Sequence, residues 1–371
     1  MTLPLPALVS NRQVLAEIRN GIGLITLDRA NALNALSLPM IRDITTLLLA
    51  WRNEPKIKGM FVRGAVQEGK GVAFCAGGDI RFFHQAAITG DARLDDFFSE
   101  EYALNHLIHG FPKPYVAWMD GVVMGGGMGI SQGAAVRIVT ERTKMAMPET
   151  NIGFFPDVGG GWFLSRAPGH VGEYLALCGQ VIGAGDAIAW GLADSYLPAS
   201  RLASLLAAIG EATIATEADW LRLVRAQVEA APAPHLASRL ADIDRHFCEA
   251  GVAEIMASLQ ADPGPWAQET LQGLRRRSPL MLSVTLEQIR RGRGMGLADN
   301  LRMERDLVRN CFQLRPGTAS ETVEGIRALA VDKDHAPRWN PASIEEVTEE
   351  MVHDYFVSPW PAHAHPLRHL A

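Results

Sequence analysis

The sequence predicts a protein of the α/β (α+β) class, in which strands, helices and glycine-rich loops are followed by a mostly helical second half. Short apolar runs of strand composition alternate with helical patterns up to about residue 198, and glycine clusters follow several of these runs. Strand signals nearly vanish beyond Pro198. The chain has 371 residues, 48% of them hydrophobic, which is enough for about two folding units with large cores.

The N-terminal elements are predicted from local patterns. Apolar runs at residues 14–18 and 22–27 flank Asn20-Gly21, a dipeptide favoured in hairpin turns that need positive φ. A helix is predicted to begin after Ser37, a typical N-cap residue, because apolar residues then recur at the helical period. Further strands are predicted at residues 59–63, 115–119, 136–140 and 144–147.

We expect three consecutive regions along the chain. Residues 1–198 carry the predicted strands and the glycine-rich segments, and residues 199–357 form a helical region. Residues 358–371 are rich in proline and histidine, which predicts a disordered tail. We predict no metal site at the tail histidines, because carboxylate and cysteine partners are missing nearby.

Charge and composition exclude several classes of protein. With 41 acidic and 35 basic side chains the formal net charge is −6, which disfavours a dedicated nucleic-acid binder. No uncharged apolar stretch reaches the roughly 18 residues of a membrane span. The four cysteines are widely spaced and the N-terminus lacks the pattern of a secretory signal, so we predict the cytoplasm as the location.

Two glycine motifs resemble nucleotide-binding sites but depart from them. Gly64 with Gly69-Lys70 has the spacing of a P-loop, yet Gly71 stands where Ser or Thr is needed for magnesium. The glycines at residues 125–129 do not match the dinucleotide fingerprint in any register, so a nicotinamide cofactor is not predicted.

A third motif, at residues 129–133 (GISQG), matches the G-x-S-x-G nucleophile elbow of serine hydrolases. An elbow serine lies at the abrupt end of a strand, whereas Ser131 lies well beyond the predicted strand end and inside the helix that the glycines open. We therefore expect Ser131 to be a small helix residue that packs or bonds a nearby carbonyl.

Three other segments carry the residues that point to chemistry. Residues 73–80 (AFCAGGDI) and 120–127 are predicted strand ends that pass through glycines into a helix. Amides at a helix start point toward a ligand, and two amides directed at one point form an oxyanion hole. Residues 147–161 place Glu149 and Asp157 among apolar residues and glycines, where a carboxylate is either paired or tuned for proton transfer and attack.

The order and spacing of these segments resemble the enoyl-CoA hydratase/isomerase (crotonase) family, and within it most closely the 3-hydroxyisobutyryl-CoA hydrolases. The resemblance is carried by residues 31–37 (NALNALS), 74–81 (FCAGGDIR), 121–131 (GVVMGGGMGIS), 147–164 (MPETNIGFFPDVGGGWFL) and 324–339. It implies a crotonase-like spiral of repeated ββα units followed by a mostly helical C-terminal region. Relative to the hydratases, about residues 200–275 look inserted.

The resemblance also implies roles for single residues. The amides of Gly78 and Gly126 would form the oxyanion hole for a thioester oxygen, and backbone around Ala76 and Gly78 would meet the CoA adenine. The catalytic acids would be Glu149 and Asp157.

The acids distinguish activities within the family. Hydratases use a glutamate where Gly129 stands here, while the hydrolases have the glycine together with Glu149 and Asp157. The pattern predicts cleavage of 3-hydroxyisobutyryl-CoA, or of a similar 3-hydroxyacyl-CoA, in valine or branched-chain catabolism. The hydrolases often carry a histidine where Gly133 stands, a departure that bears on substrate preference.

Two routes and two rival functions stay open at this point. Glu149 either attacks the thioester carbonyl to give a mixed anhydride or activates the attacking water, with Asp157 positioning the water or a substrate hydroxyl. The rivals are an enoyl-CoA isomerase or hydratase and a CoA-binding protein without turnover. We expect no metal, no cofactor beyond the CoA of the substrate, no nucleic-acid or membrane partner, and, by resemblance, a trimer or other homo-oligomer.

Overall fold

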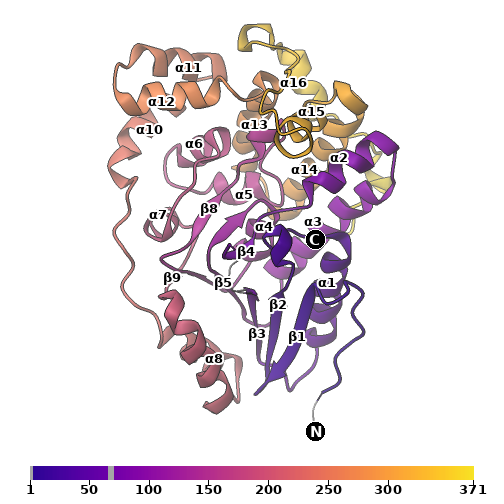
Figure 1. Ribbon diagram of the computed structural model, residues 1–371, viewed down its shortest axis with the longest axis vertical. Coiled ribbons are helices and arrows are strands. Elements are labelled where there is room, and N and C mark those ends of the chain that lie inside the picture. Colours follow the sequence, from indigo (N-terminus) through magenta and orange to yellow (C-terminus); the bar gives the residue numbers. More distant parts are fainter. Residues whose placement is uncertain (1–2, 66–70) are drawn as a thin grey trace. The chain divides into compact units, whose positions relative to one another are not determined.

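The computed structural model describes residues 3–65 and 71–371 (Figure 1). The chain divides into two compact units. Unit 1 consists of Met1–Gly78, Ala103–Met145 and Ile182–Ala237, and unit 2 of Asp79–Tyr102, Ala146–Val181 and Ser238–Ala371. The units therefore differ from the regions predicted with a boundary near residue 198, because both predicted regions contribute to each unit. Gly69 and Lys70 of the P-loop-like motif lie outside the described residues.

Unit 1 is built on two sheets. Its strands are β1 (Val14–Arg19), β2 (Ile22–Leu27), β3 (Gly59–Gly64), β4 (Ala73–Cys75), β5 (Tyr115–Met119), β6 (Val122–Met124), β7 (Val136–Val139), β8 (Lys144–Ala146) and β9 (Ser195–Tyr196). Among the described residues, six strands form one sheet in the order β1-β2-β3-β5-β7-β9, and β4, β6 and β8 form another. The β1–β2 pair is antiparallel, and the pairs from β2 to β9 are parallel.

The order of these strands shows a repeat. Each of β3, β5 and β7 lies in the larger sheet and is followed in sequence by a strand of the smaller sheet. A helix comes next in each case: α2 (Ile80–Thr89), α4 (Gly126–Gln132) or the short 3₁₀ helix η2 (Glu149–Ile152). This succession is the ββα repeat that the sequence resemblance implied.

The predicted hairpin and first helix are confirmed. Asn20 and Gly21 join β1 to β2 with φ angles of 49° and 79°. Helix α1 (Leu38–Arg52) begins after Ser37. Its Trp51 packs on Gly23 of β2, where a Cβ atom would lie 2.5 Å from the indole ring. Helix α1 therefore covers the face of the larger sheet to which Gly23 belongs.

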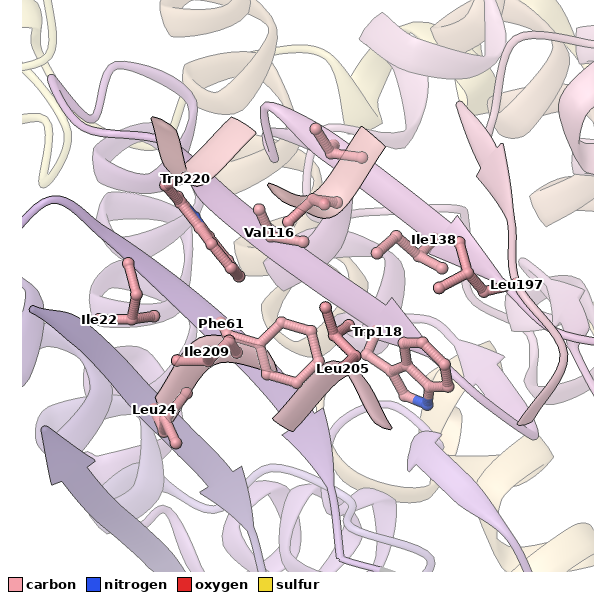
Figure 2. Close-up of a cluster of buried hydrophobic side chains, with 12 residues drawn as sticks. Ile22, Leu24, Phe61, Val116, Trp118, Ile138, Leu197, Leu205, Ile209 and Trp220 are labelled. Atoms are coloured by element: carbon pink, nitrogen blue, oxygen red, sulfur yellow. The ribbon is translucent and has the colours of Figure 1, made fainter. Parts of the chain in front are cut away.

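The opposite face of this sheet packs against α8 (Leu202–Glu211) and α9 (Glu217–Arg225). Successive side chains alternate across a strand, so Ile22 and Leu24 point away from the face of Gly23 and into this core (Figure 2). The fully buried Trp220 of α9 stands edge-on to Phe61 of β3, with ring centroids 6.3 Å apart. The core comprises Ile22, Leu24, Phe61, Val116, Trp118, Val136, Ile138, Leu197, Leu205, Ile209, Trp220 and Val224. Helices α8 and α9 belong to the segment of about residues 200–275 that looks inserted relative to the hydratases, so part of that segment completes the core of unit 1.

Unit 2 is mostly helical, as predicted for the second half of the chain. Its helices are α2, α3 (Arg93–His109, up to Tyr102), α5 (Gly160–Leu164), α6 (Val171–Cys178), α10 (Leu240–Phe247), α11 (Val252–Ala261), α12 (Pro265–Leu274), α13 (Pro279–Gly292), α14 (Leu297–Gln313), α15 (Glu321–Ile326) and α16 (Glu349–Tyr355). The remaining helix of unit 1 is α7 (Ala184–Ala189). In the part of the chain that the structure describes, no helix is long and apolar enough to cross a membrane.

The C-terminal tail is ordered within unit 2, which corrects the prediction of disorder. Leu367 is fully buried and Leu370 nearly so. Arg302 of α14 donates hydrogen bonds to the carbonyl oxygens of both leucines. The ring of Trp360 lies 4.7 Å from the guanidinium carbon of Arg305. A few buried apolar residues therefore fix residues 358–371 in unit 2, although the composition of this segment alone predicted disorder.

Candidate active site

The predicted amide residues lie in unit 1 at the ends of β4 and β6. Ala76 and Gly78 follow β4, and Gly126 is the first residue of α4, after Gly125 with its non-helical φ of 48°. The first N–H groups of a helix have no acceptor within that helix. A Cβ atom on Gly77 would lie 3.8 Å from the nitrogen of Gly126, so the two glycine loops lie side by side. Unit 1 thus brings together the residues predicted for the oxyanion hole.

The buried Ser131 lies inside α4, as predicted. Its hydroxyl donates to the carbonyl oxygen of Gly127 at 2.8 Å, and the carbonyl oxygen of Met128 lies at 3.2 Å. Ser131 is therefore a packed serine within a helix and does not lie at the strand-to-helix turn that defines a nucleophile elbow. At Gly133, which ends the helix, a Cβ atom would lie 2.8 Å from the backbone of His109, so close packing favours glycine there.

The two predicted acids come together in unit 2. Glu149 begins η2 and is 8% exposed, and Asp157 follows Pro156 and is 5% exposed. Burial, and then the charge of Asp157, raise the pKa of Glu149 well above its usual range. Burial raises the pKa of Asp157 to about 7, although a hydrogen bond from Tyr102 acts in the opposite direction. The pKa values of both carboxyl groups are thus raised above their usual ranges.

A third acid, Glu101 of α3, joins them and was missed from the sequence. Its side chain is 2% exposed, and its Oε1 atom has no hydrogen-bond partner among the described residues. Burial and the charges of Asp157 and Glu149 raise its pKa well above the usual range. In the sequence, Glu100 and Glu101 look like the solvated face of a helix, and no local signal separates one from the other.

Two more buried groups hold the segment that carries Asp157. The hydroxyl of Tyr102 donates to Asp157 Oδ2 at 2.8 Å. Glu304 of α14 accepts hydrogen bonds from the N–H groups of Gly159 at 2.6 Å and Gly161 at 2.9 Å. Burial raises the pKa of Glu304 to about 8. Sequence reasoning did not identify either residue, because each lies on a helix far from the motif in the chain.

We call the four carboxylates Glu101, Glu149, Asp157 and Glu304 the acid cluster. In the described part of the chain, none of the four forms an ion pair with Lys, Arg or His. No group of three or more His, Cys, Asp or Glu side chains there is arranged to hold a metal ion. Like charges in a buried site cannot all be ionised, so the cluster binds protons near neutral pH. Such acids can transfer a proton or attack a carbonyl group.

Comparison with known proteins identifies the family. The profile of the family described as enoyl-CoA hydratase/isomerase matches residues 22–356. The chain belongs to the enoyl-CoA hydratase/isomerase family. Relatives within it include the mitochondrial 3-hydroxyisobutyryl-CoA hydrolases of Gallus gallus, 38% identical over 94% of this chain and 89% of that protein, and of Xenopus laevis, 41% identical over 91% and 86%. The 3-hydroxyisobutyryl-CoA hydrolase 1 of Arabidopsis thaliana is 37% identical over 94% and 92%.

Two solved structures share the fold over nearly the whole chain. A carnitinyl-CoA dehydratase from Mycobacterium thermoresistibile is 39% identical, with a TM-score of 0.86 over 95% of this chain and 98% of that one. An enoyl-CoA hydratase from Rhodobacter sphaeroides 2.4.1 is 38% identical, with a TM-score of 0.84 over 94% and 98%. The crotonase-like fold predicted by resemblance is therefore confirmed. Proteins with this fold are named for different reactions, so the fold alone does not determine the reaction, which depends on the side chains of the site.

Proposed function

We propose that this protein is an acyl-CoA thioester hydrolase that cleaves 3-hydroxyisobutyryl-CoA, or a similar 3-hydroxyacyl-CoA, to the free acid and CoA. The observation that carries the proposal is the buried pair of Glu149 and Asp157, which has no cation beside it among the described residues. The position where the hydratases carry a glutamate is Gly129. Relatives that are 35–41% identical and are named as 3-hydroxyisobutyryl-CoA hydrolases support the same reading.

In this proposal the amides of Gly78 and Gly126 polarise the thioester. Attack on the carbonyl carbon transfers negative charge to its oxygen, and a preorganised N–H donor at that position contributes about 3 kcal/mol. The backbone around Ala76 and Gly78 holds the CoA adenine, so that binding energy fixes the thioester for attack. The proposed reaction uses no metal, and no cofactor other than the CoA that belongs to the substrate.

Glu149 carries the covalent or general-base step. In the covalent route its carboxylate attacks the carbonyl carbon, the C–S bond breaks, CoA leaves as the thiolate, and water then hydrolyses the mixed anhydride. In the general-base route Glu149 removes a proton from the water that attacks the thioester directly. In both routes Asp157 positions the water or the substrate hydroxyl.

The proposal is tested by the release of free CoA thiol from 3-hydroxyisobutyryl-CoA and 3-hydroxypropionyl-CoA, followed with a thiol-reactive dye. Crotonyl-CoA serves as the comparison. Fast release from the two hydroxyacyl substrates alone supports the hydrolase and recognition of the β-hydroxyl group. No release from any of them would remove this function.

A hydratase or isomerase of the same family is the second candidate, and the dehydratase and hydratase names of the two solved structures favour it. Loss of the crotonyl-CoA double bond, or its migration in a longer enoyl-CoA, would support that candidate. Formation of the thiol without either change would exclude it.

Hydrolysis in ¹⁸O-labelled water under single turnover separates the two routes. Label in the Glu149 carboxyl group identifies the covalent route, because water that attacks the glutamyl carbon of the anhydride leaves its oxygen on Glu149, whereas attack at the acyl carbon places it in the released acid. The general-base route leaves Glu149 unlabelled and places the label only in the released acid.

The setting of the enzyme is proposed as well. We propose a role in valine or branched-chain catabolism, a cytoplasmic location and a homo-oligomer, with acyl-CoA as the partner and no nucleic-acid or membrane partner. The relatives in Gallus gallus and Xenopus laevis are named as mitochondrial.

A further inference from the structure

We propose that Tyr102 is a positioning residue for Asp157, whose hydroxyl fixes one carboxylate oxygen and keeps that acid in the orientation and charge state that the reaction uses. The kinetic part of this inference rests on the proposed function, whereas its structural part stands on contacts within unit 2.

The first observation is the hydrogen bond itself. Tyr102 Oη lies 2.8 Å from Asp157 Oδ2, and both side chains are buried. A hydrogen bond from a neutral donor to a charged acceptor is worth more than a neutral pair, and more again away from water. Burial and then the charge of Asp157 raise the pKa of Tyr102 well above its usual value, so its hydroxyl keeps its proton and remains a donor.

The second observation is that the ring of Tyr102 is held in place. Phe98 lies one helical turn earlier on α3, and the two ring centroids are 6.2 Å apart in an edge-to-face arrangement. Phe98 in turn packs against Phe154 at 6.1 Å and Phe312 at 6.0 Å. Because these rings are buried together, the hydroxyl of Tyr102 has a fixed direction.

The third observation concerns the backbone around Asp157. The chain turns sharply after it, with a φ of 55° at Val158 and 92° at Gly159. Glu304 accepts the N–H groups of Gly159 and Gly161, so this turn is held from α14. The backbone of the loop is thereby fixed by Glu304, and the carboxylate at the end of the side chain is fixed by Tyr102.

The fourth observation is the charge around the pair. The groups that act electrostatically on Asp157 or Tyr102 are Glu101 on α3, Glu149 in η2, and Glu304, Arg305 and Cys311 on α14. The guanidinium group of Arg305 is bonded to Asp95. Burial therefore opposes the ionised form of Asp157, and the hydrogen bond from Tyr102 favours it.

The test is the pH dependence of kcat/KM for thioester hydrolysis by the Tyr102→Phe variant. If Asp157 acts as the carboxylate, activity rises with pH through its pKa, and loss of the hydrogen bond raises that pKa. We expect the acidic limb to move upward by about one pH unit, with a rate roughly fivefold lower at pH 7 and nearly that of the wild type at pH 9. An equal loss at every pH would overturn the proposal.

Tyr115→Phe is the matched control. Tyr115 is equally buried, and its hydroxyl has no hydrogen-bond partner among the described residues. We expect this variant to keep the wild-type pH profile. The same shift in both variants would attribute the effect to the general loss of a buried hydroxyl and would overturn the assignment to Tyr102.

A double-mutant cycle with Asp157→Asn separates positioning from packing. If Tyr102 acts through Asp157, Tyr102→Phe should change kcat less than about twofold once Asp157 is already replaced. Additive losses would contradict the proposal.

Infrared difference spectra between each protein and its Asp157→Asn counterpart report protonation of Asp157 without any turnover. The titration midpoint should be higher in Tyr102→Phe, and equal midpoints would overturn the inference. A wild-type protein that releases no CoA would instead remove the proposed function, while the spectra would still decide the role of Tyr102.

Discussion

Two charged clusters in unit 2, each with members from a segment that resembles a family motif, hold buried carboxylates in opposite ways. In the first, which we call the Arg327 cluster, Arg327 donates to both oxygens of Glu324 at 2.8 Å and to Asp332 and Asp334 at 2.7 Å. The hydrogen bonds from Arg327 lower the pKa of Glu324. In the acid cluster none of the four carboxylates is ion-paired with a cation among the described residues, and burial raises the pKa of Glu149.

This difference shows that a sequence motif alone does not reveal whether its carboxylate is paired with a cation in the folded protein. A carboxylate bound by its own guanidinium group stays charged over the neutral range and holds two segments of chain together. A buried carboxylate among other carboxylates has a raised pKa, so that once ionised it is a stronger base, which general acid/base chemistry uses. The sequence segments 147–164 and 324–339 both resemble family motifs. Only the structure shows that the carboxylate in the second is paired with a cation, which indicates a structural role, whereas those in the first are not, which indicates a chemical one.

The largest expected effect is on kcat, and it comes from replacing a buried carboxylate that is not paired with a cation. We expect Glu149→Gln to lower kcat for thioester hydrolysis at least about a hundredfold, because the amide can neither attack nor accept a proton. The midpoint of thermal unfolding should stay the same or rise, since a buried charge is removed. Glu350→Gln, at an exposed position of α16, is the control and should change neither quantity. Retained activity in Glu149→Gln would refute its role.

Removal of the cation from the Arg327 cluster should lower stability and leave kcat nearly unchanged, the opposite of the result expected for Glu149→Gln. Arg327→Met leaves the buried Glu324 without its main partner, and we expect the unfolding midpoint to fall by about 3 °C. The value of kcat for the folded protein should change little. Arg338→Met is the control, because that side chain is 83% exposed and lies 3.5 Å from Glu324. An unchanged midpoint in Arg327→Met would mean that the cluster contributes nothing to stability.

The pH dependence of stability should differ in sign between the clusters. The raised pKa values of Asp157 (about 7) and Glu304 (about 8) mean that the folded state binds protons more tightly, so their contribution is complete below about pH 4 and is lost as the pH rises through 7 to 8. The lowered pKa of Glu324 gives a contribution that is present above about pH 4 and is lost in acid.

Chemical denaturation between pH 4 and 9 measures this difference. Asp157→Asn should reduce the loss of stability between pH 5 and 8 by about 2 kcal/mol, because it removes a carboxyl group whose pKa is about 7 in the folded state and about 4 in the unfolded chain. Glu324→Gln should leave that interval unchanged and alter the slope only below about pH 5. Identical curves for Asp157→Asn and the wild type would contradict the pKa assigned to Asp157.

The smallest effect is expected for a buried polar group that already has a neutral partner. Ser131→Ala removes the hydrogen bond to the Gly127 carbonyl oxygen and should change kcat less than about twofold and stability by about 1 kcal/mol or less. Covalent labelling of Ser131 in the wild type by a fluorophosphonate would contradict this expectation and restore the nucleophile-elbow reading.

The elements predicted well from the sequence are those whose causes are local. Asn20 and Gly21 determine the hairpin because their own φ angles are positive, and the helix after Ser37 follows from its own apolar period. Ser131 was predicted correctly for the same reason, since its partner lies within one turn of the same helix.

The features that were missed depend on contacts between distant segments. Glu101 looks like a surface residue until α3 is packed beside the segments that carry Glu149 and Asp157. Leu367 and Leu370 are too few to mark the tail as ordered, yet both are buried in unit 2. The units themselves are made of interleaved stretches of chain, which no boundary in composition reveals.

This interleaving gives synthesis on the ribosome a fixed order of events. Every segment of unit 1 has been made once Ala237 is added, whereas unit 2 extends to Ala371. Gly159 is separated from Glu304, which accepts its N–H group, by 145 residues, or roughly ten to thirty seconds of translation. Throughout that interval the growing chain contains Glu149 and Asp157 but not the carboxylate that holds their loop. The nascent protein therefore completes its glycine loops well before its acids acquire their final surroundings.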